Sequence, residues 1–279
     1  MSPPSNPAPE PAVVADPTTG TPPPEMSGPP IFVVGCHRSG TTLFRLILDS
    51  HPHISCGPET RFLADLEKIT DDDNWPRMGL YGFSKEYWHQ HVAALFNDFQ
   101  SRYADSRGKT RWADKTPLYA GHLDYLNTLF PDALFINVVR DGRDVARSHR
   151  DTWGYMSGIK AIEKWPRYIR MGEDFAPEAG PDRYLEVRYE NLVGDTEKQM
   201  REVLDFVGEP WDDAVLHHTD HSHDVMERYD SYTSKRRSQK GEGAVYRSRV
   251  GGGRKANDPL MKALLRLRAG KTLKRIGYT

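Results

Sequence analysis

Short runs of apolar residues alternate with amphipathic segments along most of the chain. Residues 31–34 and 134–139 have the length and composition of buried strands, and residues 111–113 and 183–187 are expected to form two further short strands. Helical spacing of apolar residues begins near Thr41, near Arg143 and through 199–207, and residues 62–109 are also mainly helical in pattern. Strands that alternate with helices predict βαβ units, and therefore an α/β fold with a central parallel sheet flanked by helices.

Three loops follow the C-terminal ends of predicted strands. They are residues 35–42, 114–117 and 140–148. In open parallel sheets, ligands bind at this edge, because the strand ends and the helix N-termini meet there. We therefore expect these loops to form one binding site.

The first of these loops has the features of an anion site. Gly35 and Gly40 bracket a tight turn between a buried strand and a helix, which directs backbone N–H groups and the positive helix end toward an anion. In nucleotide triphosphatases a lysine of this loop reaches the β- and γ-phosphates. Thr41 stands at that place here, and Arg38 is the only cation inside the loop. The loop is thus suited to a phosphate or phosphosulfate, although glycine turns between strand and helix also occur without any ligand.

Five motifs in a fixed order extend the signal beyond this loop. They are RSGTTLFRLILDSHPHISCGPETR at 38–61, DKTP at 114–117, VVRDGRDVARS at 138–148, RYENL at 188–192 and LDFVGEPWDDAVLHH at 204–218. Together they resemble the sulfotransferase superfamily, most closely the tyrosylprotein sulfotransferases and the related bacterial branch. The resemblance covers most of residues 31–220. It implies a P-loop-like three-layer fold and an enzyme that uses 3′-phosphoadenosine-5′-phosphosulfate (PAPS) as sulfuryl donor without a metal.

The resemblance also implies which residues bind the donor. The 5′-phosphosulfate would lie against Arg38, Ser39, Gly40, Thr41 and Thr42. Arg140 and Ser148 would bind the 3′-phosphate, and Tyr189 the adenosine portion, although a packing role for Tyr189 competes closely. Arg143 and Arg147 are expected to pair with Asp141 and Asp144 instead. Ser234 and Arg247 are the best matches to a basic loop that closes over the 3′-phosphate, with a solvated basic loop as the equal alternative.

The same comparison implies the catalytic groups. Glu59 would be the general base for the acceptor hydroxyl, Lys115 would stabilise the leaving oxygen, and Arg61 would lie beside donor and acceptor, with Arg38 assisting the chemistry. Pro58 departs from the relatives, which carry a second acidic residue there. The structural alternatives are a Glu59–Arg61 pair and an ordinary surface Lys115. If Glu59 is not the base, the rivals His37 and His122 remain.

Two other classes of protein stay open at this point. A P-loop kinase is disfavoured by Thr41 in the lysine position and by the lack of an evident strand carrying a Mg²⁺-binding aspartate. A non-catalytic adenosine-phosphate-binding protein would need neither Glu59 nor Lys115. The histidines at 217, 218, 221 and 223 fit no zinc spacing and are expected to lie at a helix end and in a surface loop.

Composition and charge limit the partners and the cellular location that we expect for this protein. A net charge of −1 gives no general case for binding nucleic acid, and no apolar run is long enough to span a membrane. We therefore expect a cytoplasmic protein of bacterial type, which departs from the membrane-anchored Golgi enzymes that its motifs resemble. The expected acceptor is a small metabolite, glycolipid, carbohydrate or phenol. Residues 1–30 hold about half of the prolines and predict a disordered tail before a domain spanning 31–279.

Overall fold

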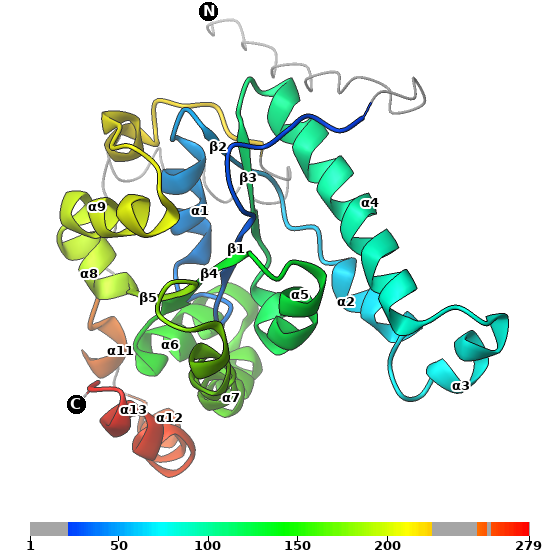
Figure 1. Ribbon diagram of the computed structural model, residues 1–279. Helices are drawn as coiled ribbons and strands as arrows, with labels where there is room; N and C mark the ends of the chain where they lie inside the picture. The colour runs from blue at the N-terminus through cyan, green and yellow to red at the C-terminus, as the bar shows by residue number, and fades with distance from the viewer. Residues whose placement is uncertain (1–21, 225–249, 256–257, 279) are drawn as a thin grey trace, which may run out of the picture.

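A five-stranded parallel sheet forms the centre of the computed structural model, which describes residues 22–224, 250–255 and 258–278 (Figure 1). The strand order is β2-β3-β1-β4-β5, and every neighbouring pair is parallel. The strands are β1 (Ile31–Val34), β2 (Ile54–Cys56), β3 (Arg111–Lys115), β4 (Leu134–Val139) and β5 (Tyr184–Arg188). Because β1 lies between β3 and β4, the loops after these three strands open at adjacent points of one edge.

Helices cover both faces of the sheet (Figure 1). On one face, Ile31, Val33 and Ile136 pack against α1 (Thr41–Asp49), α8 (Tyr189–Gly194) and α9 (Thr196–Val207). On the other, Phe32 and Phe135 pack against α4 (Lys85–Ser106), α5 (Leu123–Leu129) and α7 (Tyr155–Ala179). Alternate side chains of each strand point to opposite faces, so β1 is apolar throughout, whereas the equally buried β3 also carries Arg111, Asp114 and Lys115. The predicted three-layer α/β fold is confirmed.

A third apolar cluster joins the C-terminal helices to helices α6 and α7. Val145 of α6 (Gly142–Trp153) and Trp165 of α7 pack with Met261 of α12 (Pro259–Leu264) and Leu273 of α13 (Gly270–Arg275). The remaining short elements are α2 (Leu63–Leu66), η2 (Glu67–Ile69), α3 (Trp75–Met78), η3 (Gly79–Tyr81), η4 (Pro117–Gly121), η5 (Asp213–His217), α11 (Gly252–Lys255) and the π-helical turn η7 (Leu265–Ala269).

Several elements are absent from the sequence prediction, among them β2 and α7. Strand β2 has only three residues, too few for a periodic pattern to show. Helix α7 runs for 25 residues and contains Pro166 and Pro177, which usually end helices rather than lie inside them. Strands β3 and β5 lie within two residues of their predicted ends, and β1 and β4 coincide with theirs.

The chain joins the sheet before residue 31. Ser27 N donates to Thr110 O at 2.7 Å, Arg111 Nε donates to Pro29 O at 2.9 Å, and Leu134 N donates to Pro30 O at 2.8 Å. The last residues of the predicted tail are therefore bonded to the domain. Residues 1–21 lie outside the described part, and the disorder of the tail stays a prediction.

Candidate functional site

The loop after β1 is shaped by two glycines. Gly35 has φ +140°, and a Cβ there would lie 2.4 Å from the carbonyl oxygen of Val138. Gly40 has φ +100°, and a Cβ there would lie 2.2 Å from Cδ2 of Tyr189. Only glycine tolerates both the backbone angle and the close approach. The loop is thereby packed against the ends of β4 and β5.

This loop fits an anion. Helix α1 begins at Thr41 directly after Gly40, and no side chain caps its first turn, which leaves its N-terminal N–H groups available. The hydroxyl oxygen of Ser39 is buried, with 1% of the residue exposed, and has no hydrogen-bond partner among the described residues. A buried polar group without a partner is costly, so this hydroxyl is suited to an incoming ligand oxygen.

Two arginines and a serine lie together beside the loop. Arg38 Nε donates to Ser148 Oγ at 3.0 Å, and Arg140 donates from Nη1 to the carbonyl oxygen of Arg38 at 3.2 Å. The guanidinium of Arg140 also lies 4.2 Å from the ring centroid of Tyr189. The structure thus brings together four of the predicted donor-binding residues: Arg38 of the loop after β1, Arg140 directly after β4, Ser148 on α6 and Tyr189 at the start of α8. Arg143, by contrast, pairs with Asp141 at 2.7 Å, as expected.

Glu59 and Lys115 are in direct contact. Lys115 Nζ donates to Glu59 Oε1 at 2.5 Å, and the two side chains are 4% and 23% exposed. Lys115 is the last residue of β3, and Glu59 lies in the loop after β2, the neighbouring strand. Both alternatives weighed for these residues differ from this arrangement: Glu59 pairs with Lys115 rather than Arg61, and Lys115 is buried rather than on the surface.

The backbone is strained at two places of this edge. Among the described residues, Arg38 and Arg61 are the two non-glycine residues with positive φ, at 73° and 62°. Each such conformation costs about 1–2 kcal/mol and is often retained at functional sites. Arg61 is exposed and follows Glu59 by two residues, so its position depends on how the 59–61 segment is held.

The histidines considered as alternative bases, His37 and His122, and the neighbouring His149 bond to groups other than Glu59. His149 donates from Nε2 to the carbonyl oxygen of His37 at 3.2 Å, and its other ring nitrogen lies 3.2 Å from Ser157 Oγ. Burial lowers the pKa of His149 to about 4 and lowers the pKa of His37 as well, so both rings are neutral at pH 7. His122 pairs with Glu67 instead. His149 was missed in the sequence because its partner lies 112 residues away.

The C-terminal part of the chain docks beside Arg140. Gly251 and Gly253 donate their backbone N–H groups to the two carboxylate oxygens of Asp144, at 2.8 and 2.5 Å. A Cβ at Gly253 would lie 2.3 Å from the Arg143 backbone, which explains the glycine at that position. Ser234 and Arg247 lie outside the described residues, and their role in donor binding stays a prediction.

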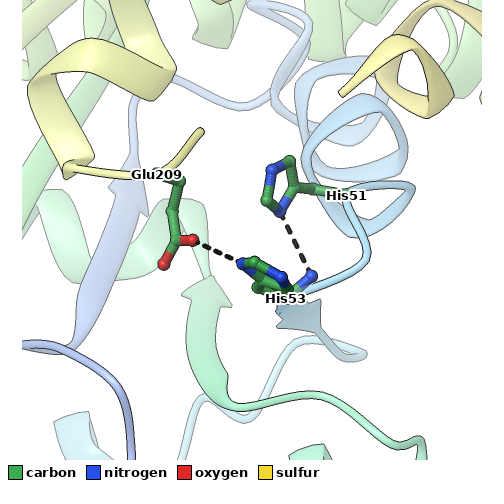
Figure 2. A group of neighbouring side chains, drawn as sticks. All are labelled: His51, His53 and Glu209. Atoms are coloured by element: carbon green, nitrogen blue, oxygen red, sulfur yellow. Dashed lines mark hydrogen bonds and ion pairs between the residues drawn. The ribbon is translucent and has the colours of Figure 1, made fainter. Parts of the chain in front are cut away.

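Figure 2 shows a separate group of possible metal ligands in the described part of the chain: His51, His53 and Glu209. His51 donates from Nε2 to the Pro210 carbonyl at 2.9 Å, and its Nδ1 accepts the backbone N–H of His53 at 3.2 Å. Glu209 accepts from His53 Nδ1 at 2.9 Å and lies 3.2 Å from Nη1 of the buried Arg111. A metal would have to displace these bonds and compete with that guanidinium. We interpret the group as a structural link at the N-terminal edge of the sheet.

The prediction of a surface position is wrong for His218 and His223, because His218 is buried and the His223 side chain is 4% exposed. It is confirmed for His217 and His221, which are exposed. Nδ1 of His223 lies 2.6 Å from Asp49 Oδ2, and its Nε2 lies 2.8 Å from the His218 carbonyl oxygen. His217 is exposed and lies 3.8 Å from Asp220. The prediction that the reaction needs no metal is not tested by these contacts and stays a prediction.

The fold and this edge together define a P-loop-like α/β protein with a loop that fits an anion and an adjacent Glu59–Lys115 ion pair. A family model for the sulfotransferase family matches residues 29–213, which include every described element of the site except the C-terminal segment. The chain belongs to the sulfotransferase family, as its motifs predicted.

Individual relatives agree. The chain is 32% identical over 203 residues to protein-tyrosine sulfotransferase A of Caenorhabditis elegans, covering 69% of this chain and 53% of that protein. It is 33% identical to the Drosophila melanogaster protein-tyrosine sulfotransferase, covering 68% and 40%, and 34% identical to protein-tyrosine sulfotransferase 1 of Danio rerio, covering 68% and 56%. The chain therefore spans about half the length of the curated relatives that it matches.

Solved structures support the fold. The sulfotransferase domain of the Synechococcus PCC 7002 olefin synthase aligns with a TM-score of 0.60 at 23% identity, covering 88% of this chain and 96% of that one. The sulfotransferase domain of the curacin biosynthetic pathway aligns with a TM-score of 0.58 at 17% identity, covering 90% and 98%.

These matches correct one expectation and leave another unsupported. The predicted cytoplasmic location is wrong, because the matching relatives are protein-tyrosine sulfotransferases, the membrane-anchored Golgi group from which that prediction departed. The bacterial-type assignment is not supported either, since the relatives named above are from animals. Within residues 22–224, 250–255 and 258–278, no helix has the length and apolar character needed to cross a membrane.

Proposed function

We propose that this protein transfers the sulfuryl group of PAPS to an acceptor hydroxyl. The observation that carries the proposal is the Glu59–Lys115 contact beside an anion-binding loop that contains the unpartnered hydroxyl of Ser39. One bond breaks, between sulfur and the bridging oxygen of the donor, and one forms, between sulfur and the acceptor oxygen. The acceptor proton goes to Glu59, and 3′-phosphoadenosine-5′-phosphate leaves.

The donor would be held by the residues that the structure brings together at the ends of β1, β4 and β5. Arg38, Ser39, Gly40, Thr41 and Thr42 would surround the 5′-phosphosulfate, because the loop supplies backbone N–H groups, hydroxyls and one guanidinium. Arg140 and Ser148 would bind the 3′-phosphate, with Tyr189 against the adenosine. The contact of Arg38 Nε with Ser148 Oγ supports this, since it joins the two phosphate-binding groups into one surface.

Glu59 and Lys115 would divide the chemistry between them. Sulfuryl transfer depends mainly on alignment of the reacting oxygens and on stabilisation of charge. Lys115, a buried ammonium, would donate to the bridging oxygen as negative charge develops there, while Glu59 takes the acceptor proton. The two side chains touch each other in this structure, so they must separate when sulfur and both oxygens lie between them. Arg61 would lie on the acceptor side.

We further propose that the acceptor is the phenol of a tyrosine in a protein or peptide, in place of the metabolite, glycolipid, carbohydrate or simple phenol expected from the sequence. The similarity to three animal protein-tyrosine sulfotransferases at 32–34% identity supports this choice. A phenol, with a pKa near 10, also needs less help from a carboxylate base than an aliphatic alcohol does.

The test is transfer of label from ³⁵S-PAPS to tyrosine-containing peptides, with sugars, aliphatic alcohols and simple phenols as competing acceptors. Sulfated peptide identified by mass spectrometry is the expected result, and the matched peptide with phenylalanine in place of tyrosine should remain unlabelled. Exclusive labelling of a sugar or alcohol would contradict the acceptor class. Phosphoryl transfer from γ-labelled ATP, or binding of adenosine bisphosphate without any transfer, would contradict the sulfotransferase activity itself.

A further inference from the structure

Thr60 lies between the proposed base Glu59 and the strained Arg61. Both its backbone N–H and its hydroxyl bond the sequence neighbours of Lys115. Its backbone N–H donates to Thr116 Oγ1 at 3.2 Å. Its hydroxyl donates to Asp114 Oδ2 at 2.8 Å. Asp114 and Thr116 are the sequence neighbours of Lys115, so Glu59 and Thr60 together bond three consecutive residues, 114–116, at the end of β3 and directly after it.

The hydroxyl of Thr60 belongs to a longer chain of bonds. Since its only proton goes to Asp114, the 2.7 Å contact with Tyr119 must have the tyrosine as donor. Tyr119 in turn accepts the backbone N–H of Leu63 at 3.2 Å, where α2 begins. Gln100 donates to the same Asp114 oxygen at 3.2 Å. Every donor in this chain points toward one buried carboxylate.

Asp114 is a buried carboxyl group, which is unusual for an aspartate. The residue is 1% exposed, and burial raises its pKa to about 6, with the hydroxyls of Thr116 and Thr60 opposing the rise. A buried carboxylate is costly, and its bond from the Thr60 hydroxyl holds the 60–63 segment against β3, while the bond from Gln100 ties it to α4. Neither the proposed proton transfer nor the proposed donor contacts use it.

We propose that Thr60 is a positioning residue, which with Asp114, Thr116 and Tyr119 sets the register between Glu59 and Lys115; this inference rests on the proposed function. Without the Thr60 hydroxyl, two bonds described here still join residues 59 and 60 to residues 114–116: the Thr60 backbone N–H to Thr116, and the ion pair itself. The positive φ of Arg61 then favours relaxation of the segment, and Glu59 loses its alignment with the leaving-group lysine.

The experiment compares Thr60→Val, which keeps the shape without the hydroxyl, with Thr60→Ser, which keeps the hydroxyl. Thr128→Val is the matched control, because that hydroxyl bonds only a backbone carbonyl on the exposed side of α5. We expect kcat to fall about 10- to 100-fold in Thr60→Val and to remain within about threefold of the original in Thr60→Ser and the control. The affinity for 3′,5′-adenosine bisphosphate should not change. Unchanged kcat in Thr60→Val, an equal loss in Thr60→Ser, or an equal loss of nucleotide affinity would overturn the proposal.

A second measurement does not depend on sulfuryl transfer. Acetylation of Lys115 by acetic anhydride, relative to the exposed Lys68 and quantified by peptide mass spectrometry, reports whether Glu59 still covers the ammonium. We expect faster labelling of Lys115 in Thr60→Val and the original rate in Thr60→Ser. If the unchanged protein transferred no sulfuryl group, the proposed function would fail, but the labelling would still decide this inference, since equal rates in all variants refute it.

Discussion

Replacing Glu59 by glutamine separates the chemistry of the site from its stability. The amide keeps the size of the side chain and can still accept the bond from Lys115, but it cannot take a proton at neutral pH. Loss of a general base lowers turnover by roughly 10²–10⁴-fold. We expect a loss of this size in kcat at saturating donor and peptide, with little change in the affinity for adenosine bisphosphate.

The structure also limits how much stability can be lost. Breaking a fully buried ion pair costs about 3–5 kcal/mol, but the Glu59 side chain is 23% exposed and glutamine retains the hydrogen bond. We expect a loss of about 1–2 kcal/mol, which for a domain of this size lowers Tm by roughly 2–8 °C. Domains are stable by about 5–15 kcal/mol, so the variant stays folded at 25 °C and unfolding cannot account for the lost turnover.

The assay uses a series of phenolic acceptors with different acidity. An acidic phenol needs less help from a base, so it should partly rescue Glu59→Gln, whereas Lys115→Ala, which loses stabilisation of the leaving oxygen, should stay impaired. Glu178→Gln is the matched control, because that carboxylate only accepts a bond from Asn127 at the surface. Near-normal turnover of Glu59→Gln on a weakly acidic phenol, in a folded protein, would refute the assignment of the base.

Three further results are expected. Arg140→Ala should weaken binding of 3′,5′-adenosine bisphosphate by about 1.5–3 kcal/mol in a calorimetric titration, because it removes a charge-assisted bond; equal affinity would contradict the 3′-phosphate assignment. His149, whose pKa burial lowers to about 4, binds a proton more readily when unfolded, so its contribution to stability is present above pH ~6.5 and is lost as the pH falls toward 4. Urea unfolding should therefore show a smaller loss between pH 7.5 and 5 for His149→Gln than for the original chain, and parallel losses would argue against a buried neutral ring. Deletion of residues 2–21 should leave Tm within about 1 °C, since the proline-rich composition predicts no core contacts, and a large shift would show that the tail packs on the domain.

The loops of the site could be predicted because the strands before them are recognisable as buried apolar runs. β1 is a continuous apolar run and β4 is apolar except for Asn137; both are buried on both faces, and the polar residues that follow them lie at one edge in any parallel sheet. Arg38, Arg140 and Ser148 were expected together for this reason, and their contacts are short.

The supporting contacts could not be predicted in the same way. Thr60 and Asp114 are 54 residues apart, and their hydrogen bond depends on β2, a strand too short to recognise, lying next to β3. His149 and the glycines at 251–253 likewise acquire partners only through the packing of α6 against distant segments. A pattern along the chain reports which residues are buried, whereas these bonds depend on which buried residues meet.

The close approach of Gly40 to Tyr189 has a consequence for protein engineering. The same tyrosine ring lies against the Arg140 guanidinium, so it cannot move aside for a side chain at position 40 without disturbing that contact. A smaller residue at position 189 would make room but would not relieve the φ of +100°, which strains any residue other than glycine. Saturation mutagenesis of position 40 should therefore return only glycine among active clones, even in a library that also varies position 189.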